Sequence, residues 1–327
     1  MVGASGVSAR VSPPSFGSGW IGLRRTFGRR DAPRRGGPLA SESRWAWLFL
    51  APTLLGLLVL SAAPIGATFL ISLTDWDLLR APQFVGLDNY LGLLDNERFG
   101  LALRNTIFYV VISVPLGMTL ALGFALALNR AIRGIAWIRT MYFLPLVTSA
   151  IAVGLVWAWI YSPTDGLLNQ VLGVLGVPAQ RWISDPFWAM PSIIAMSVWQ
   201  GLPASTIIFL AGLQAIPRDF YEAAEVDGSG RLTSFRHITM PLLTPSIFFT
   251  GILALIGSFQ IFDQVFVLSN PGKPSSATIT LVYFIYENGF NFFKMGLATA
   301  ASWVLFLIVA VLTFVYFRSQ RRWVYYQ

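Results

Sequence analysis

The sequence contains no cysteine, a single histidine (His237) and only two lysines, Lys273 and Lys294. Without cysteine the chain cannot form a disulfide, a thiolate metal site or a thiol nucleophile. One histidine is too few for a histidine metal cluster, and it argues against a Ser-His-Asp triad within apolar segments. We therefore predict that the chain is not an enzyme and that it has no catalytic residues, no metal site and no cofactor of its own.

Charged residues make up only 12% of the sequence, whereas hydrophobic residues make up 55% and the mean hydropathy is +0.63. A soluble domain carries about 25% charged residues, so this chain has too few to cover a water-exposed surface. Its apolar residues come in long blocks rather than in alternation. Such blocks satisfy their own backbone hydrogen bonds in lipid only as helices. We predict an all-α, polytopic membrane protein.

Six apolar blocks are each close to the ~20 residues that a helix needs to cross a bilayer. The predicted transmembrane helices are Trp45–Leu73, Ile107–Leu128, Tyr142–Ile160, Met190–Leu213, Ser246–Leu268 and Leu297–Phe317. The fourth contains Gly201 and Pro203 beside a polar amide, Gln200. This pattern predicts either an ordinary kink or a broken helix beside a translocation path.

The net charge of +8 comes from arginines that flank the apolar blocks, which indicates membrane topology rather than nucleic-acid binding. These arginines place both termini on the cytoplasmic side. Residues 1–43 are predicted to be a disordered, Arg-rich cytoplasmic tail that anchors topology or, alternatively, contacts lipid or protein. Residues 44–318 form the transmembrane domain, and residues 319–327 form a second cytoplasmic tail.

The segment 217–244, between the fourth and fifth predicted spans, is too long for a simple connector. Pro217 suits a helix start, Gly228 or Gly230 would end that helix, and a second helix could run from Arg231 to Ile238. The first helix carries a small, smooth face flanked by acids. Those acids argue against a helix lying on the negatively charged cytoplasmic leaflet. The segment therefore predicts a cytoplasmic helix-turn-helix that contacts another protein.

The same segment resembles the EAA loop of ABC importer permeases, EAA-x3-G-x9-I-x-LP. The pattern is carried by Glu222, Ala223, Ala224, Gly228, Ile238, Met240 and Pro241, and Met240 replaces leucine. Shorter motifs are similar to the carbohydrate-uptake branch, which includes maltose-type and glycerol-3-phosphate-type permeases. They are Arg104-Asn105-Thr106, Phe143-Leu144-Pro145, Gly166-Leu167-Leu168-Asn169, Trp199-Gln200-Gly201-Leu202-Pro203 and Ala211-Gly212-Leu213-Gln214. The resemblance covers residues 45–317.

This resemblance implies a permease in the inner (cytoplasmic) membrane, in a heterodimer with a second permease subunit. It also implies two ATPase subunits, which bind ATP and Mg, and an extracytoplasmic solute-binding protein. The chain itself has no phosphate-binding Walker A motif. The residues expected to dock on an ATPase are Glu222, Ala223, Ala224, Asp227, Gly228, Ile238 and Pro241.

Polar residues recur at helical spacing in the fifth predicted span: Gly257, Gln260, Asp263 and Gln264. Asp263 lies near the predicted outer end of that helix. An acid in a span marks a solute path or a paired site, although an acid solvated at the helix end is the alternative. At a helix C-terminus its charge would oppose the helix dipole. With Trp199 and Gln200, these residues form the predicted substrate path, while Trp157, Trp159 and Trp199 could instead belong to an interfacial belt or to packing.

A neutral, polyhydroxylated solute suits carboxylate and amide groups, whereas a phosphate would prefer arginine or a helix N-terminus. The sequence therefore favours a sugar or related polyol, with glycerol-3-phosphate or a glycerophosphodiester as the alternative. A secondary transporter and an intramembrane enzyme are more remote alternatives. The former leaves the 217–244 segment unexplained, and the latter lacks a nucleophile and base.

Overall fold

The computed structural model describes residues 39–130, 133–268 and 276–325. The predicted tail of residues 1–43 lies almost wholly outside this part of the chain. The chain divides into two compact units, Met1–Val59 and Leu60–Gln327. The described part of the first unit is helical, with α1 at Leu39–Leu57 and the start of the π-helical turn η1, Leu58–Ala62.

The second unit is almost entirely helical, with one short antiparallel hairpin, β1 (Thr74–Asp75) and β2 (Gln83–Phe84). The helices are α2 (Ala63–Ser72), α3 (Asp88–Leu94), α4 (Glu97–Leu128), α5 (Ile135–Phe143), η2 (Leu144–Val147), α6 (Ala150–Ile160), α7 (Leu167–Val174), α8 (Pro186–Ala215), α9 (Arg218–Val226), α10 (Arg231–Ser234), η3 (Phe235–Thr239), α11 (Met240–Leu242), α12 (Thr244–Phe259), α13 (Asp263–Leu268), α14 (Leu281–Tyr286), η4 (Glu287–Asn291) and α15 (Met295–Gln320).

Four helices in the described residues are long and apolar enough to cross a membrane: Trp45–Ser72, Glu97–Leu128, Pro186–Ala215 and Met295–Gln320. Two further segments qualify only as bent pairs, and counting each pair as one span gives up to six. The second, fourth and sixth predicted spans are therefore parts of longer helices. α4 begins at Glu97 because the side chain of Asn96 caps it, accepting the N–H of Phe99 at 3.0 Å.

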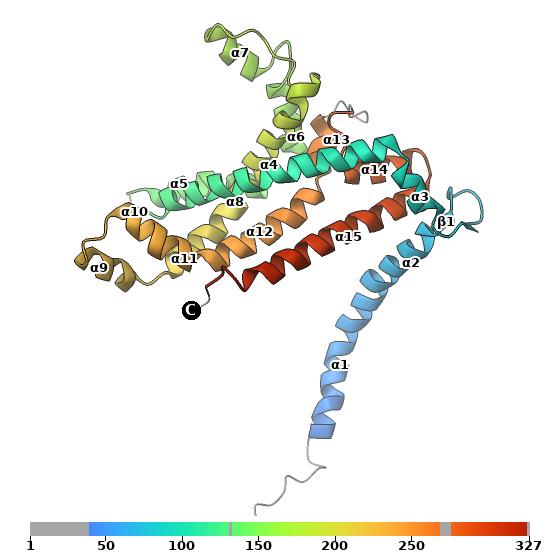
Figure 1. Cartoon of the computed structure of the whole chain (residues 1–327), viewed down its shortest axis with the longest axis horizontal. Coiled ribbons are helices and arrows are strands. Elements are labelled where there is room, and N and C mark those ends of the chain that lie inside the picture. Colours follow the sequence, from blue (N-terminus) through green and yellow to red (C-terminus); the bar gives the residue numbers. More distant parts are fainter. Residues whose placement is uncertain (1–38, 131–132, 269–275, 326–327) are drawn as a thin grey trace, which may run out of the picture. The chain divides into compact units, whose positions relative to one another are not determined.

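The helices α4, α8, α12 and α15 run alongside one another and form the core of this unit (Figure 1). Small residues of α4, including Ala102, Ala121 and Ala125, are fully buried and let α8 approach closely. Larger side chains of α8, such as Ile193 and Phe209, fill the space beside them. α8 stays helical through Pro203, so the predicted alternative of a broken helix at that residue is wrong.

The third predicted span is not one helix. α5 with η2 and then α6 meet at a bend of 100°. Pro145 has no N–H to donate, and Thr148 and Ser149 adopt extended backbone after it (ψ 145° and 133°), so the helix cannot continue. The prediction of one continuous helix over Tyr142–Ile160 is therefore wrong.

The fifth predicted span, Ser246–Leu268, is also divided. α12 ends at Phe259, Gln260 to Phe262 are not helical, and α13 begins at Asp263. The preceding helical run, Arg231–Leu242, is bent by 62° from α12. The break after Phe259 matters for the site, because the predicted polar stripe falls on both sides of it.

Candidate functional site

A cavity of about 380 Å³ lies where α4 and α8 meet the break between α12 and α13. Tyr109 reaches it from α4, and Ser197, Gln200 and Gly201 reach it from α8. The broken segment contributes the remaining wall, with Gly257, Gln260, Ile261, Phe262, Asp263 and Gln264. Nε2 of Gln264 donates a hydrogen bond to Oε1 of Gln200 at 3.1 Å, which ties the break to α8.

A tertiary hydrogen bond supports the break in the helix. The last turn of α12 tightens, with the N–H of Gln260 donating to the carbonyl of Gly257 at 3.1 Å. The carbonyl of Ile261 lies outside a helix and accepts Oγ1 of Thr280 at 3.2 Å. A new helix then starts, because the N–H of Phe266 donates to the carbonyl of Phe262 at 2.8 Å. The backbone groups released by the break are thus partly satisfied inside the protein, as lipid surroundings require.

Asp263 occupies the first turn of α13. The positive end of a helix dipole favours a carboxylate there. The prediction that Asp263 sits at a helix C-terminus and opposes the dipole is therefore wrong. The described residues contain two ion pairs, Arg80 with Asp77 and Arg98 with Glu287, so Asp263 has no cationic partner among them.

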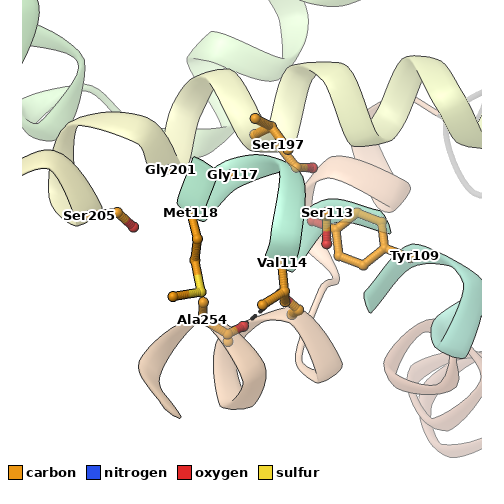
Figure 2. Close-up of a pocket in the computed structure, with 12 residues that line it drawn as sticks. Tyr109, Ser113, Val114, Gly117, Met118, Ser197, Gly201, Ser205 and Ala254 are labelled. Carbon is orange, nitrogen blue, oxygen red and sulfur yellow. Dashed lines mark hydrogen bonds between the residues drawn. The ribbon is translucent and has the colours of Figure 1, made fainter. Parts of the chain in front are cut away.

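A second, smaller cavity of about 200 Å³ adjoins the first and shares Tyr109, Ser197, Gly201 and Gly257 with it. Figure 2 shows Tyr109, Ser113, Ser197 and Ser205 around this space. Oγ of Ser113 and Oγ of Ser197 are buried and have no hydrogen-bond partner among the described residues. Oγ of Ser258 instead donates to the carbonyl of Ala254 at 2.6 Å. The two cavities together form a mostly uncharged, hydroxyl-rich and amide-rich space inside an apolar bundle.

Two glycines widen this space. A Cβ atom built at Gly201 or at Gly257 would meet no atom within 4 Å. These positions therefore need no glycine for packing or for backbone conformation. Their missing side chains leave this space open.

The structure brings four of the five predicted path residues together, namely Gln200, Gln260, Asp263 and Gln264. Trp199 lies apart from them: its ring packs against Trp157 with 5.6 Å between centroids. Sequence reasoning missed Tyr109, Ser113, Ser197, Ser205 and Ser258. A signal was present, because Tyr109 and Ser113 are four residues apart on α4, and Ser197, Gly201 and Ser205 repeat at the same interval on α8.

The second candidate site is the helix α9 and the turn that follows it. The turn has the hydrogen bonds of a Schellman motif. The N–H of Gly228 donates to the carbonyl of Glu225 at 3.0 Å, and the N–H of Ser229 donates to that of Ala224 at 2.8 Å. Gly228 has φ +76°, a left-handed conformation that glycine adopts without steric cost. Of the two glycines considered, Gly228 is therefore the one that ends the helix.

No residue of α9 is buried. Glu222 and Ala223 are exposed, and so are the flanking Asp227 and Gly228. Three large apolar side chains are also exposed on this segment: Phe220 (48%), Val226 (88%) and Leu232 (79%). The hydroxyl of Tyr221 lies 2.9 Å from Oγ1 of Thr239 and holds α9 against the returning helix. The segment thus has an exposed surface of apolar and acidic side chains, and the Tyr221 to Thr239 contact holds it against the returning helix.

The returning helix is longer than predicted. It runs from Arg231 through Leu242 rather than stopping at Ile238. A π-helical turn precedes Pro241, and within it the N–H of Met240 bonds to the carbonyl of Phe235. π-Helix is rare and occurs mostly as single-turn bulges of this kind within α-helical runs. Ala224, Ile238 and Pro241 are partly buried, so of the seven predicted docking residues they are the less accessible ones.

Comparison with known proteins agrees with this geometry. The family described as "Binding-protein-dependent transport system inner membrane component" matches residues 97–324. The chain belongs to this family. The match begins at the first residue of α4 and includes both cavities and α9. The chain is therefore a multi-pass membrane protein, and the alternative of a secondary transporter is not supported.

Relatives extend the similarity over most of the chain. A probable ABC transporter permease protein, YesP of Bacillus subtilis, is 35% identical over 301 residues, covering 91% of this chain and 97% of the relative. The trehalose/maltose transport system permease protein MalF of Thermococcus litoralis is 35% identical over 281 residues, covering 86% and 95%.

A solved structure of a bacterial ABC transporter involved in import of the acidic polysaccharide alginate contains a chain with the same fold. Its TM-score is 0.77 at 23% identity, and the match covers 88% of this chain and 99% of that one.

Proposed function

We propose that this chain is the permease subunit of an ATP-driven ABC importer and that it passes a sugar or related polyol into the cytoplasm. The named relative that transports trehalose and maltose supports a carbohydrate as the solute. In this proposal the protein lies in the cytoplasmic membrane with both termini on the cytoplasmic side. It pairs with a second permease subunit and receives its solute from an extracytoplasmic binding protein.

The observation that carries the choice of solute is the composition of the cavity. Among the described residues that line it, hydroxyl, amide and carboxylate groups are present, and no arginine or lysine is. Such groups exchange hydrogen bonds with sugar hydroxyls, whereas a phosphate would meet Asp263 with no cation to offset repulsion. A neutral sugar is thus favoured over glycerol-3-phosphate.

The energy for transport would enter through α9. We assign Glu222, Ala223, Ala224, Asp227 and Gly228 to a surface that docks in a cleft of an ATPase subunit, with Ile238 and Pro241 supporting it from behind. That subunit would bind ATP and Mg. Tyr221 fixes α9 to η3, and η3 leads through α11 directly into α12. Movement of α9 would therefore be transmitted to α12, which ends at the cavity.

Solute-stimulated ATP hydrolysis in reconstituted complexes tests the assignment of the cavity. Charge-assisted hydrogen bonds contribute roughly 1.5 to 3 kcal/mol, so Asp263→Ala should raise the half-saturating solute concentration by about tenfold or more. Gln200→Ala should raise it less. Gln170→Ala removes an exposed amide outside both cavities and is the matched control. An unchanged half-saturation in both cavity variants, at normal assembly, would contradict the assignment.

A further inference from the structure

A separate pocket of about 400 Å³ lies at the C-terminal end of α15. Phe314 and Val315 line one part of it, and Arg318, Ser319, Arg321 and Arg322 line the other. It shares no residue with the solute cavity or with α9. One half of the pocket is therefore apolar, and the other half carries three guanidinium groups.

The three arginines have no anionic partner among the described residues. All three are exposed, and the two ion pairs in the described part of the chain involve other residues. Arginine remains charged at any physiological pH and offers a planar fork of donors that suits phosphate oxygens. The cluster is thus a positively charged surface that no acidic side chain of the described residues neutralises.

Several contacts hold the end of the chain in place around this pocket. Oγ of Ser319 donates to the carbonyl of Tyr316 at 2.7 Å, and the ring of Trp323 packs 6.2 Å from that of Tyr316. The N–H of Tyr325 donates to Oγ1 of Thr244 at 3.0 Å. These contacts fasten the segment after α15 to the start of α12, so the arginines sit on a folded turn rather than a frayed end.

The apolar half of the pocket continues along the membrane-spanning part of α15. Phe314 is 70% exposed and Val315 is 57% exposed, and Val311 one turn earlier is 59% exposed. A ligand that fills the pocket must therefore combine an anionic group for the arginines with a hydrocarbon part for this face. A soluble phosphate has only the first of these, and a phospholipid has both.

We propose that Arg318, Arg321 and Arg322, with Phe314 and Val315, form a binding site for one anionic phospholipid. Its phosphate lies against the guanidinium groups, and its acyl chain lies along α15. The Tyr325 to Thr244 bond ties the segment that follows these arginines to the first residue of α12.

Native mass spectrometry of the purified full-length chain tests the proposal, with phosphatidylglycerol and phosphatidylcholine added in separate titrations. The wild-type chain should bind a first phosphatidylglycerol in preference to phosphatidylcholine. The double variant Arg318→Gln with Arg322→Gln should weaken phosphatidylglycerol binding by about tenfold or more. The reason is that each arginine near an anionic headgroup adds electrostatic attraction to the free energy of binding. Arg318→Lys with Arg322→Lys keeps the charge and should retain most of the affinity.

The control is Arg130→Gln with Arg133→Gln, which removes two other exposed arginines and the same total charge. It should leave phosphatidylglycerol affinity within about twofold of wild type. The proposal is overturned if the control loses as much affinity as the double variant, or if wild type shows no preference for phosphatidylglycerol. It is also overturned if millimolar inorganic phosphate displaces the lipid, since the site would then recognise a soluble anion.

Discussion

At the scale of single residues, Gly257 lines both cavities, and its missing side chain leaves them open. Gly257→Leu should fit without backbone strain, because a Cβ there meets nothing within 4 Å and leucine favours helix by about 0.8 kcal/mol over glycine. Its side chain would narrow the path and lower solute uptake by about tenfold or more at unchanged expression.

Gly123→Leu on α4 is the matched control for this experiment. A Cβ at Gly123 also meets nothing within 4 Å, and this residue lines neither cavity. Uptake by this variant should equal that of wild type. If Gly257→Leu transports normally, the path does not run past Gly257.

Arg98 and Glu287 form a two-pronged ion pair that joins the start of α4 to η4. Nε and Nη2 of Arg98 donate to the two carboxylate oxygens at 2.8 and 2.7 Å. The side chain of Glu287 is only 8% exposed, whereas that of Arg98 is 46% exposed. Arg98→Ala leaves a buried charge without a partner and should cost about 3 kcal/mol of stability or more.

Glu287→Gln should cost less, roughly 1 to 2 kcal/mol, because Arg98 can be hydrated and glutamine still accepts a hydrogen bond. Thermal unfolding in detergent measures both. Arg80→Ala, which removes an 88% exposed partner of Asp77, should change stability by less than about 0.5 kcal/mol. Equal losses of stability from Arg98→Ala and Glu287→Gln would show that the burial of the Glu287 carboxylate does not determine the cost of breaking this ion pair.

Residue types identified much of the cavity from sequence. Gln200, Gln260, Asp263 and Gln264 stand out as polar groups in apolar blocks, and they do meet in space. The reason for their meeting was not visible, because the break after Phe259 depends on a hydrogen bond from Thr280, nineteen residues beyond Ile261. Tyr109 and the serines were overlooked because hydroxyl residues are common in membrane helices.

At the scale of elements, the turn after α9 depends on Gly228. Gly228→Ala places a Cβ at φ +76°, which costs roughly 1 to 2 kcal/mol and should loosen the end of α9. If α9 transmits ATPase closure, solute-stimulated ATP hydrolysis should fall severalfold while the permease remains inserted. Gly230→Ala is the control, since Gly230 has φ −72° and no atom within 4 Å of a Cβ. Normal coupling in Gly228→Ala would contradict this role.

The elements also show where sequence patterns were sufficient. The spacing within 217–244 predicted two helices joined at a glycine, and both are present because capping and positive φ are local requirements. The third and fifth spans were predicted as single helices. Pro145 indicates locally that a helix is interrupted. The size of the bend at Thr148 and Ser149 depends on tertiary packing, which spacing and hydropathy do not describe.

At the scale of the whole molecule, this chain belongs to a family of membrane components of binding-protein-dependent transport systems. The chain has two polar cavities where α4 and α8 meet the α12 to α13 break, and it has an exposed helix at α9. Neither feature performs transport alone in the proposed function. An external binding protein would deliver the solute, and an ATPase would drive the change in access.

The most direct test is uptake of labelled sugar into proteoliposomes that contain the complete complex with this chain. We expect uptake only when the solute-binding protein is outside and ATP with Mg is inside. We also expect Gly257→Leu to abolish most of this uptake and Gly123→Leu to leave it unchanged. Uptake driven by an ion gradient without ATP would show that the chain does not belong to an ATP-driven importer. ATP-dependent uptake that Gly257→Leu leaves unchanged would show that the solute does not pass through these cavities.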